Sequence, residues 1–259
     1  MTERTTLTSP RSSESPADGA ERRVRKVVTD RSGGVSEGPY GSFNLGAHVG
    51  DDPTAVAANR TRLAGLLGLP EDRMVYMEQV HSPTVTEVTP ELLDGLAGGP
   101  VPVTDALVTT LRGTALVVLT ADCVPVLLSD EEAGVVAAVH AGRLGARNGI
   151  LVRTLDEMER LGAVPARVHV LFGAAIAGTD YEIPESMARD VEERLPGSRT
   201  RTSTGTTGLD LRAGLLRQLM ERGVTMIDAD PRSTLAEESL FSYRRDGTTG
   251  RQAAVVWMP

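Results

Sequence analysis

The stretch that decides the fold is ALVVLTADCVPVLLSDEEAGVVAAVHAG, at residues 115–142. Its apolar runs, at 115–120, 124–128 and 135–139, are bounded by turn residues and predict three short buried strands. The last two runs form a hairpin, with about five residues leading away from Cys123 and about five returning to His140. At about 3.3 Å per residue the two legs nearly cancel, so Cys123 and His140 are expected at one sheet edge.

Further strands and helices are predicted on both sides of this hairpin. Apolar runs predict strands at 24–29, 74–80, 84–88, 106–109, 168–172 and 252–257. Helical periodicity predicts helices that begin at Pro53 and that cover 149–161, 184–195 and 211–222. Consecutive strands with scattered helices favour an α+β fold with mixed sheets over strict βαβ winding.

Two segments without periodicity have different compositions. Residues 30–51 are rich in glycine, and a loop of that length indicates a functional segment. Residues 1–23 are rich in Ser, Thr, Pro and charge, which predicts a disordered tail. The remainder, 24–259, is expected to form one domain.

Composition narrows the class of protein. The 259 residues include 27 basic and 35 acidic side chains, giving a formal net charge of −8, and Lys26 is the only lysine. This acidity argues against a nucleic-acid partner, although a local arginine cluster could still hold a small anion. A single cysteine excludes an intrachain disulfide, and neither a signal peptide nor a membrane span is apparent. We therefore expect a soluble, cytoplasmic protein with no membrane partner, either a monomer or a homodimer.

His81, Cys123 and His140 are candidate metal ligands, because each follows or precedes a predicted strand. Two imidazoles and a thiolate suit Zn²⁺, and three protein ligands leave a fourth position open for water, which the ion activates. The spacings of 42 and 17 residues match no short zinc motif. Two alternatives remain open: Cys123 as a buried small hydrophobe, or Cys123 as a nucleophile activated by His140, with Asp122 or another carboxylate orienting the imidazole.

Arginines near the C-terminus form a candidate anion site. Arg244, Arg245 and Arg251 surround a glycine-containing turn, whose amides and guanidinium groups suit phosphate oxygens. The alternative is a solvated hairpin in which arginine pairs with Asp246. Arg143 lies three residues after His140 and is close enough in sequence to reach an anion beside the metal.

The two other histidines are interpreted differently. His48 follows AsnLeuGlyAla in the glycine-rich segment and either lines a pocket or is exposed to solvent. His169 alternates with Val168 and Val170 on a predicted strand, which favours a structural role.

Several segments together resemble the YfiH or laccase-domain family, also described as purine nucleoside phosphorylases. The resemblance covers about residues 27–258 and includes the motifs TDRSGGVS (29–36), FNLGAHVGDDP (43–53), NR (59–60), QVH (79–81), DALVT (105–109), TADCVPVLL (120–128), HAG (140–142) and SYRRDGTTGR (242–251). It implies a four-layer α-β-β-α sandwich similar to cytotoxic necrotising factor catalytic domains. It also implies zinc ligands at His81, Cys123 and His140.

The resemblance carries several possible activities. It implies zinc-dependent phosphorolysis of adenosine, inosine, guanosine and methylthioadenosine, and deamination of adenosine. Cys123, His140 and Asp122 are then the expected catalytic residues, and Asp122 and Glu78 are candidate general acids by proximity only. Residues expected to bind nucleoside or phosphate are Asn44, His48, Arg143, Arg245 and Arg251.

Other functions are kept as alternatives. One is an amide hydrolase that edits a cell-wall precursor carrying serine, another is a copper-dependent polyphenol oxidase, and a third is a non-catalytic protein with a structural zinc. Four histidines and one cysteine fall short of a full multicopper cluster, so copper is a second choice of metal.

The sequence also departs from the family pattern. Arg143 and Leu144 stand where Trp and Arg usually follow HisAlaGly. Ala174 replaces a proline, Asp180 replaces a cysteine, and Ser233 replaces a cysteine before Thr234. We expect these changes to alter the rim of the pocket and with it the substrate preference.

Overall fold

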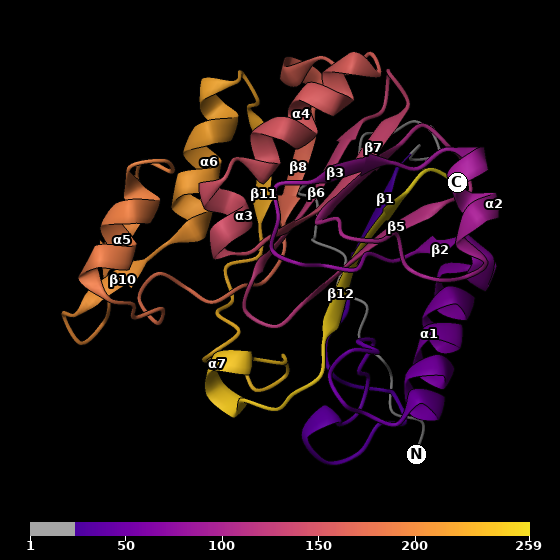
Figure 1. Cartoon of the computed structure of the whole chain (residues 1–259), viewed down its shortest axis with the longest axis horizontal. Helices are drawn as coiled ribbons and strands as arrows, with labels where there is room; N and C mark the ends of the chain where they lie inside the picture. The colour runs from indigo at the N-terminus through magenta and orange to yellow at the C-terminus, as the bar shows by residue number, and fades with distance from the viewer. Residues whose placement is uncertain (1–23) are drawn as a thin grey trace, which may run out of the picture.

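The computed structural model describes residues 24–259, in which two β-sheets pack face to face (Figure 1). The larger sheet has the order β11-β8-β6-β7-β4-β3, with strands Met226–Ala229, His169–Phe172, Val124–Asp130, Val135–Ala141, Ala106–Thr109 and Val85–Glu87. The smaller sheet has the order β1-β12-β5-β2, with strands Arg25–Val28, Gln252–Trp257, Ala115–Thr120 and Met74–Val75. A separate two-stranded sheet contains β9 and β10, Arg199–Arg201 and Thr207–Leu209. The tail predicted at 1–23 lies outside the described residues.

The three longest helices lie on the outer sides of the two large sheets (Figure 1). The α-helices, α1 to α7 in order, are Pro53–Leu67, Pro90–Leu96, Arg143–Arg147, Ile150–Arg160, Glu185–Glu192, Leu211–Glu221 and Tyr243–Asp246. Short 3-10 helices η1 to η3 cover Gly38–Tyr40, Glu71–Arg73 and Pro165–Arg167. Within residues 24–259, no helix is both long and apolar enough to cross a membrane.

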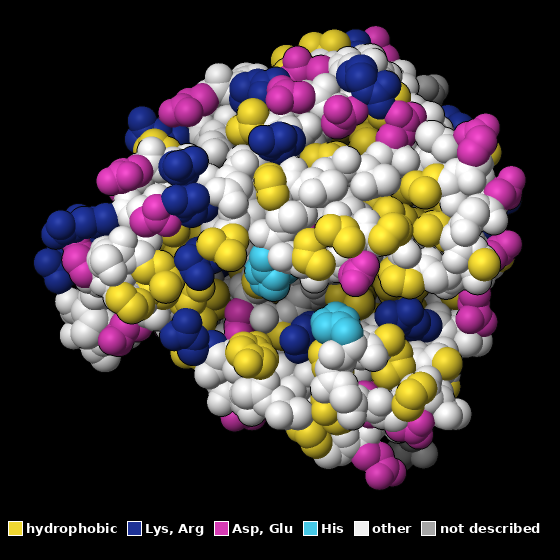
Figure 2. Space-filling view, viewed as in Figure 1, with side chains coloured by type: hydrophobic (Ala, Val, Ile, Leu, Met, Phe, Trp, Pro, Cys, Tyr) yellow, Lys and Arg dark blue, Asp and Glu magenta, His cyan; other side chains and the backbone are white. Residues whose placement is uncertain are grey.

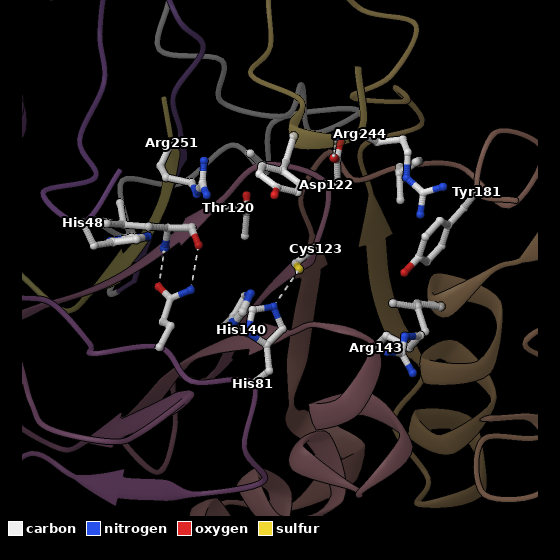
Figure 3. A pocket seen from close by; sticks show the side chains of 16 residues that line it. His48, His81, Thr120, Asp122, Cys123, His140, Arg143, Tyr181, Arg244 and Arg251 are labelled. Atoms are coloured by element: carbon white, nitrogen blue, oxygen red, sulfur yellow. Dashed lines mark hydrogen bonds between the residues drawn. The ribbon is translucent and has the colours of Figure 1, made fainter. Parts of the chain in front are cut away.

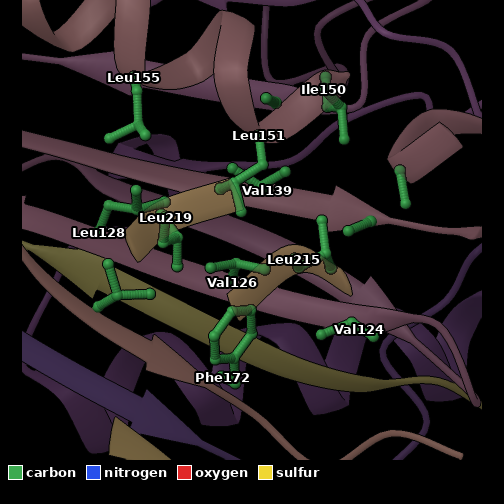
Figure 4. Close-up of a cluster of buried hydrophobic side chains, with 14 of the residues drawn as sticks. Val124, Val126, Leu128, Val139, Ile150, Leu151, Leu155, Phe172, Leu215 and Leu219 are labelled. Carbon is green, nitrogen blue, oxygen red and sulfur yellow. The ribbon is translucent and has the colours of Figure 1, made fainter. Parts of the chain in front are cut away.

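Three buried hydrophobic clusters define four layers. One lies between the sheets, where Leu116 and Val256 of the smaller sheet meet Leu127 of the larger one. A second packs the outer face of the larger sheet against α4 and α6, which contribute Leu151 and Leu215 (Figure 4). A third packs α1 and the segment at 43–45 on the smaller sheet. The predicted four-layer α-β-β-α sandwich with mixed sheets is confirmed by this arrangement.

The central hairpin forms as its sequence predicts. Strands β6 and β7 pair antiparallel, with Pro125 opposite His140 and Val124 opposite Ala141. Strand β5, however, belongs to the other sheet, paired with β12 and β2. The chain therefore crosses from one sheet to the other between Thr120 and Val124, and Cys123 lies at this crossing.

The predicted strand at 74–80 is mostly wrong, because β2 ends at Val75. Beyond it, Met77 makes only an isolated bridge with Val101, and the Gln79 side chain takes over the pairing. Its amide donates to the Leu119 carbonyl at 2.7 Å and accepts from the Leu119 N–H at 2.9 Å. A side chain thus replaces a strand at this position, a substitution that apolar periodicity does not reveal.

Candidate metal centre

His81, Cys123 and His140 converge at one end of the larger sheet (Figure 3). His81 lies in the loop before β3, Cys123 precedes β6, and His140 lies near the end of β7. Their candidate ligand atoms all lie within 4.8 Å of one another. The two imidazole rings meet edge to face, with centroids 4.7 Å apart. Side chains separated by 42 and 17 residues in sequence therefore face a common point.

The trio fits a tetrahedral zinc site. With Zn–S near 2.3 Å and Zn–N near 2.05 Å, a tetrahedral angle places sulfur and nitrogen about 3.6 Å apart. Cys123 Sγ lies 3.6 Å from His81 Nε2. His81 is exposed, Cys123 partly buried and His140 buried, so the trio is open on the His81 side. The donor set and its spacing suit Zn²⁺ with one position left for another ligand.

Asp105 orients both histidines, the role that the sequence suggested for Asp122 or another carboxylate. Its Oδ1 lies 2.8 Å from His140 Nδ1, which leaves Nε2 as the ligand atom of that ring. The same carboxylate accepts from the backbone N–H of His81 at 2.9 Å and of Ser82 at 2.6 Å. Burial raises the pKa of Asp105, but hydrogen bonds from His140 and Ser82 outweigh burial and bring it to about 2. The carboxylate is therefore ionised at neutral pH.

Two residues of the site adopt left-handed backbone conformations that non-glycine residues avoid. His81 has φ of 61° and Asp122 has φ of 90°. Asp105 holds the first of these, while the Asp122 carboxylate accepts from Thr234 Oγ1, Ser242 Oγ and the Arg244 N–H at 2.6–2.7 Å. Such strain persists where surrounding bonds enforce it, often at functional sites.

The side chains of Cys123 and His140 shift each other's ionisation. Burial raises the pKa of the Cys123 thiol, but the charge on His140 and hydrogen bonds from both imidazoles outweigh burial and lower it. Burial lowers the pKa of His140, yet Cys123 and Asp105 together raise it. Cys123 is thus held toward the thiolate form, the form that binds metals.

A cavity of about 440 Å³ opens in front of the trio. Figure 2 shows the hollow between histidine side chains, with basic and hydrophobic side chains around its edge. Besides the trio, its lining comprises His48, Gln79, Leu119, Thr120, Ala121, Asp122, Arg143, Ile176, Tyr181, Leu211, Tyr243, Arg244 and Arg251. The volume lies within the range of small-molecule sites.

One end of the cavity is built from Arg251, His48 and Thr120 (Figure 3). Arg251 Nη1 donates to the carbonyls of Thr249 and Gly250, and no acceptor among residues 24–259 engages its Nε or Nη2. Thr120 is only 2% exposed, and no group in the described part of the chain hydrogen-bonds its hydroxyl. Burial and the nearby Arg251 charge lower the pKa of His48, which favours neutral imidazole. This end offers unused donors to a ligand.

The opposite end is aromatic and cationic (Figure 3). The Arg244 guanidinium lies 4.9 Å from the centre of the Tyr181 ring, and Arg143 lies beside them. Ile176 and Leu211, both almost buried, supply the apolar part of this wall.

Three predicted residues lie away from the cavity lining. Arg245 turns inward, where its guanidinium binds the carbonyls of Thr234 and Leu240 and pairs with Asp246. The expected glycine-containing turn instead begins with helix α7, which points consecutive arginines in different directions, so Arg244 lines the cavity and Arg245 does not.

Asn44 and Glu78 also lie outside the cavity lining, and each accepts a hydrogen bond from a backbone N–H. Asn44 is fully buried, and its Oδ1 accepts from the Arg251 N–H at 2.8 Å, so it positions Arg251. Glu78 accepts from the Val103 N–H at 3.2 Å and lies outside the lining. The other predicted residues, His48, Asp122, Arg143 and Arg251, line the cavity.

Sequence reasoning missed Thr120, Tyr181 and Asp105. Thr120 ends one apolar run and Asp105 immediately precedes another, and a polar residue at such a position is a usable signal for a site at a strand end. Tyr181 lies in a segment without periodicity, and no pattern marks it.

Two departures from the family pattern contact each other. Ser233 Oγ donates to Asp180 Oδ2. The same hydroxyl accepts from the Ala177 N–H at 3.2 Å. A polar pair thus occupies positions where the family pattern has cysteines, next to the wall that contains Ile176 and Tyr181.

Comparison with known proteins agrees with this architecture. The chain is 66% identical to a purine nucleoside phosphorylase of Corynebacterium glutamicum, over 93% of this chain and 97% of that one. It is 54% identical to a purine nucleoside phosphorylase of Mycobacterium tuberculosis, over 91% and 92% of the two chains.

Solved structures show the same fold. The YlmD protein of Geobacillus stearothermophilus superposes with a TM-score of 0.86 and 34% identity, covering 95% of this chain and 98% of that one. The YfiH protein of Bacillus licheniformis gives a TM-score of 0.85 and 29% identity, covering 91% and 93%. The family model described as multi-copper polyphenol oxidoreductase laccase matches residues 25–259. The predicted resemblance is confirmed, and the chain belongs to this YfiH-like laccase family.

Proposed function

We propose that this protein is a zinc-dependent purine nucleoside phosphorylase whose active site is the cavity at His81, Cys123 and His140. The observation that carries the proposal is one cavity that joins a metal-ligand trio to an arginine with unused donors. The chain as a whole is acidic, at −8, yet Arg143, Arg244 and Arg251 line this cavity against one aspartate. A local positive field attracts an anionic co-substrate such as phosphate. The names of the relatives from Corynebacterium and Mycobacterium support the same assignment.

Phosphate is assigned to the end with Arg251, Thr120 and His48. A phosphate oxygen can accept from the free edge of a guanidinium and from a hydroxyl at once. Leaving the buried Thr120 hydroxyl unpaired costs free energy, and a bound oxygen relieves that cost. Asn44 fixes the Arg251 backbone, so the guanidinium is already positioned before phosphate arrives.

The nucleoside is assigned to the end with Tyr181 and Arg244. A purine ring is flat and apolar on its faces, and it stacks on an aromatic ring or a guanidinium plane. Ile176 and Leu211 exclude water from the same wall. The reacting ribose carbon then lies between the two ends, beside the trio.

In phosphorolysis, an oxygen of hydrogen phosphate attacks the ribose C1′ as the bond to the purine nitrogen breaks, and the proton of the hydrogen phosphate leaves with the purine. Zn²⁺, when bound by the trio, supplies Lewis-acid charge to a ligand atom in the cavity. Arg251 and Thr120 hold phosphate for attack, and Asp105 keeps His140 in the tautomer that leaves Nε2 free. Asp122 already accepts three hydrogen bonds, so its role is to hold Thr234, Ser242 and the Arg244 backbone in place.

Adenosine deamination is a second proposed activity of the same trio, because it consumes water instead of phosphate. It needs no anion at the Arg251 end. An Arg251→Met variant therefore separates the two reactions, since phosphorolysis should fall and deamination should persist.

The test is steady-state turnover by zinc-loaded protein. Inosine with phosphate should yield hypoxanthine and ribose 1-phosphate, and Arg251→Met should raise the KM for phosphate by about 10-fold or more, as expected when a charged hydrogen bond is lost. The matched control is Arg217→Met, which removes an exposed arginine paired with Glu221 on α6. No turnover of inosine or adenosine would contradict the proposal, as would an unchanged phosphate KM in Arg251→Met.

A further inference from the structure

Lys26 lies in a hydrogen-bonded chain far from the cavity. It is the only lysine among 27 basic residues. Its Nζ lies 2.7 Å from His169 Nδ1 and donates to the His169 carbonyl at 2.7 Å. On the other side of the ring, His169 Nε2 lies 2.9 Å from Asp228 Oδ2. Three side chains from β1, β8 and β11 thus form a continuous amine–imidazole–carboxylate chain.

The hydrogen-bonded chain of Lys26, His169 and Asp228 is separate from the metal centre. His169 pairs with Ser129 at the far end of β6, six residues beyond Cys123. At about 3.3 Å per residue, that separation is about 20 Å along the strand. The cavity lining includes neither Lys26, His169 nor Asp228. Nothing in the proposed phosphorolysis uses this amine.

Asp228 fixes which nitrogen of His169 donates a hydrogen bond and which accepts one. A carboxylate only accepts, so His169 Nε2 carries the hydrogen and Nδ1 is left as a base toward Lys26. Lys26 is partly buried, while the His169 and Asp228 side chains are 40% and 62% exposed. The amine therefore lies just below the surface, with a proton acceptor already aligned beside it.

The surroundings favour the neutral amine. Burial lowers the pKa of Lys26 to about 7, and the opposing charges of Asp228 and Glu131 only partly offset that effect. Burial also lowers the pKa of His169, more than its hydrogen bond to Asp228 raises it, so the ring is a neutral acceptor near pH 7. An ordinary lysine, with a pKa near 10.4, has only about one neutral molecule in a thousand at pH 7.4.

We propose that Lys26 is a nucleophilic amine and a site of N-acylation by small, uncharged acyl thioesters. In the reaction the Lys26 nitrogen attacks the thioester carbonyl carbon, an amide N–C bond forms, and the C–S bond breaks. The sulfur leaves as a thiolate, and the proton from nitrogen passes to His169 Nδ1, where Asp228 stabilises the resulting imidazolium. No oxidant or reductant is needed. The uncharged donor follows from Asp228 and Glu131, which repel anionic donors such as acyl phosphates.

The experiment is peptide-resolved mass spectrometry of the intact, zinc-loaded protein. The probe is the acetyl thioester of N-acetylcysteamine, and acetyl phosphate is the anionic comparison. The α-amino group of the chain, with an ordinary pKa near 7.7–8.0, is the internal reference. At pH 7.5, Lys26 should be acetylated by the thioester within about 10-fold of the reference rate, and its rate should rise through a midpoint near its low pKa rather than near 10. Relative to the same reference, acetyl phosphate should modify Lys26 more slowly.

Variants test the role of the imidazole. His169→Asn keeps an acceptor near Nδ1 but removes the base, so acetylation should slow by about 10-fold at pH 7.5. Lys26→Arg provides the blank for assigning the modified peptide.

Three results would each overturn the proposal. The first is a Lys26 rate more than about 100-fold below the reference, with a midpoint near 10, as for an ordinary lysine. The second is an unchanged rate in His169→Asn. The third is preference for acetyl phosphate over the thioester. The wild-type pH profile needs no variant, so the test holds even if a substitution impairs folding.

Discussion

Asp105 supports both histidines of the metal centre through one carboxylate. It bonds the ring of His140 and the backbone of His81, and its side chain has no exposed surface. A partner of this kind fixes the tautomer and direction of a ligand, and its loss typically lowers metal affinity by 10–100-fold.

We therefore expect Asp105→Asn to weaken zinc binding by about 10–100-fold, measured by competition with a chelator of known affinity. The control is Asp130→Asn, a fully buried aspartate of the same sheet that binds the Ala133 and Val164 N–H groups away from the site. Asp130→Asn should lower stability but leave zinc affinity unchanged. Equal zinc affinity in both variants would refute the role given to Asp105.

At the residue scale, the sequence predicted the trio but not its support. Hairpin geometry alone placed Cys123 near His140, because the strands leading away from one and back to the other are of nearly equal length; His140 pairs with Pro125, two residues after Cys123. Asp105 reaches His81 across 24 residues and a separate loop, a contact that no local spacing encodes. The inward direction of the Arg245 side chain was not predicted either, because consecutive residues of the short helix α7 point in different directions.

Gly142 joins β7 to α3 and lies against the metal ligands. A Cβ at this position would overlap His81 Cδ2 and come within 3.2 Å of Cys123 Sγ. Since its φ is −73°, an ordinary value, the constraint is space rather than backbone strain. The junction between strand and helix therefore requires glycine for the ligands to meet.

Gly142→Ala should lower kcat/KM for phosphorolysis by about 100-fold, because a ligand displaced by about 1 Å misplaces the reacting groups. Gly65→Ala is the matched change, within α1 and with no neighbour near the added carbon. It should stabilise the protein by up to about 1 kcal/mol and leave activity intact. Full activity in Gly142→Ala would show that the ligands have more freedom than the structure indicates.

At the element scale, long segments with regular apolar periodicity were predicted well. Segments held by side-chain hydrogen bonds instead of backbone pairing were not. The helices predicted at 149–161 and 211–222 appear as α4 and α6, whose apolar faces pack on the larger sheet. The strand predicted at 74–80 shortens to β2 because Gln79 replaces backbone pairing. Helix α3 was missed, since it has only five residues and no full apolar period.

Lys26 connects the two large sheets of the molecule, from β1 in one to β8 in the other. Its pKa in the folded protein is about 7, below the ordinary value of 10.5. Between these values the unfolded chain binds more protons than the folded chain, so this group makes stability rise with pH. The destabilising effect is complete below about pH 7 and disappears toward pH 10.5.

The Lys26→Met substitution removes the contribution of Lys26 to the pH dependence of stability. Its Tm should exceed the wild-type Tm at pH 7, and the difference should shrink steadily toward pH 10. Differential scanning calorimetry of both proteins across this range checks the prediction, because groups common to both cancel in the difference. A difference that stays constant from pH 7 to 10 would show that Lys26 is charged in the fold.

At the scale of the whole molecule, the sign of the charge in the cavity is opposite to the net charge of the chain. The chain is acidic overall, yet its cavity carries three arginines and one aspartate. Composition predicted that a local anion site could exist within an acidic protein. It could not predict which arginines form the site, because that depends on how the sheets and loops bring Arg143, Arg244 and Arg251 together.

The central claim is that His81, Cys123 and His140 hold one metal ion between them. Elemental analysis of the purified protein, alongside Cys123→Ala and His140→Ala, tests it most directly. We predict about one zinc per chain in the wild type, little copper, and loss of most zinc in both variants. Full zinc content in either variant, or a wild type that binds no zinc after zinc is supplied, would contradict the claim.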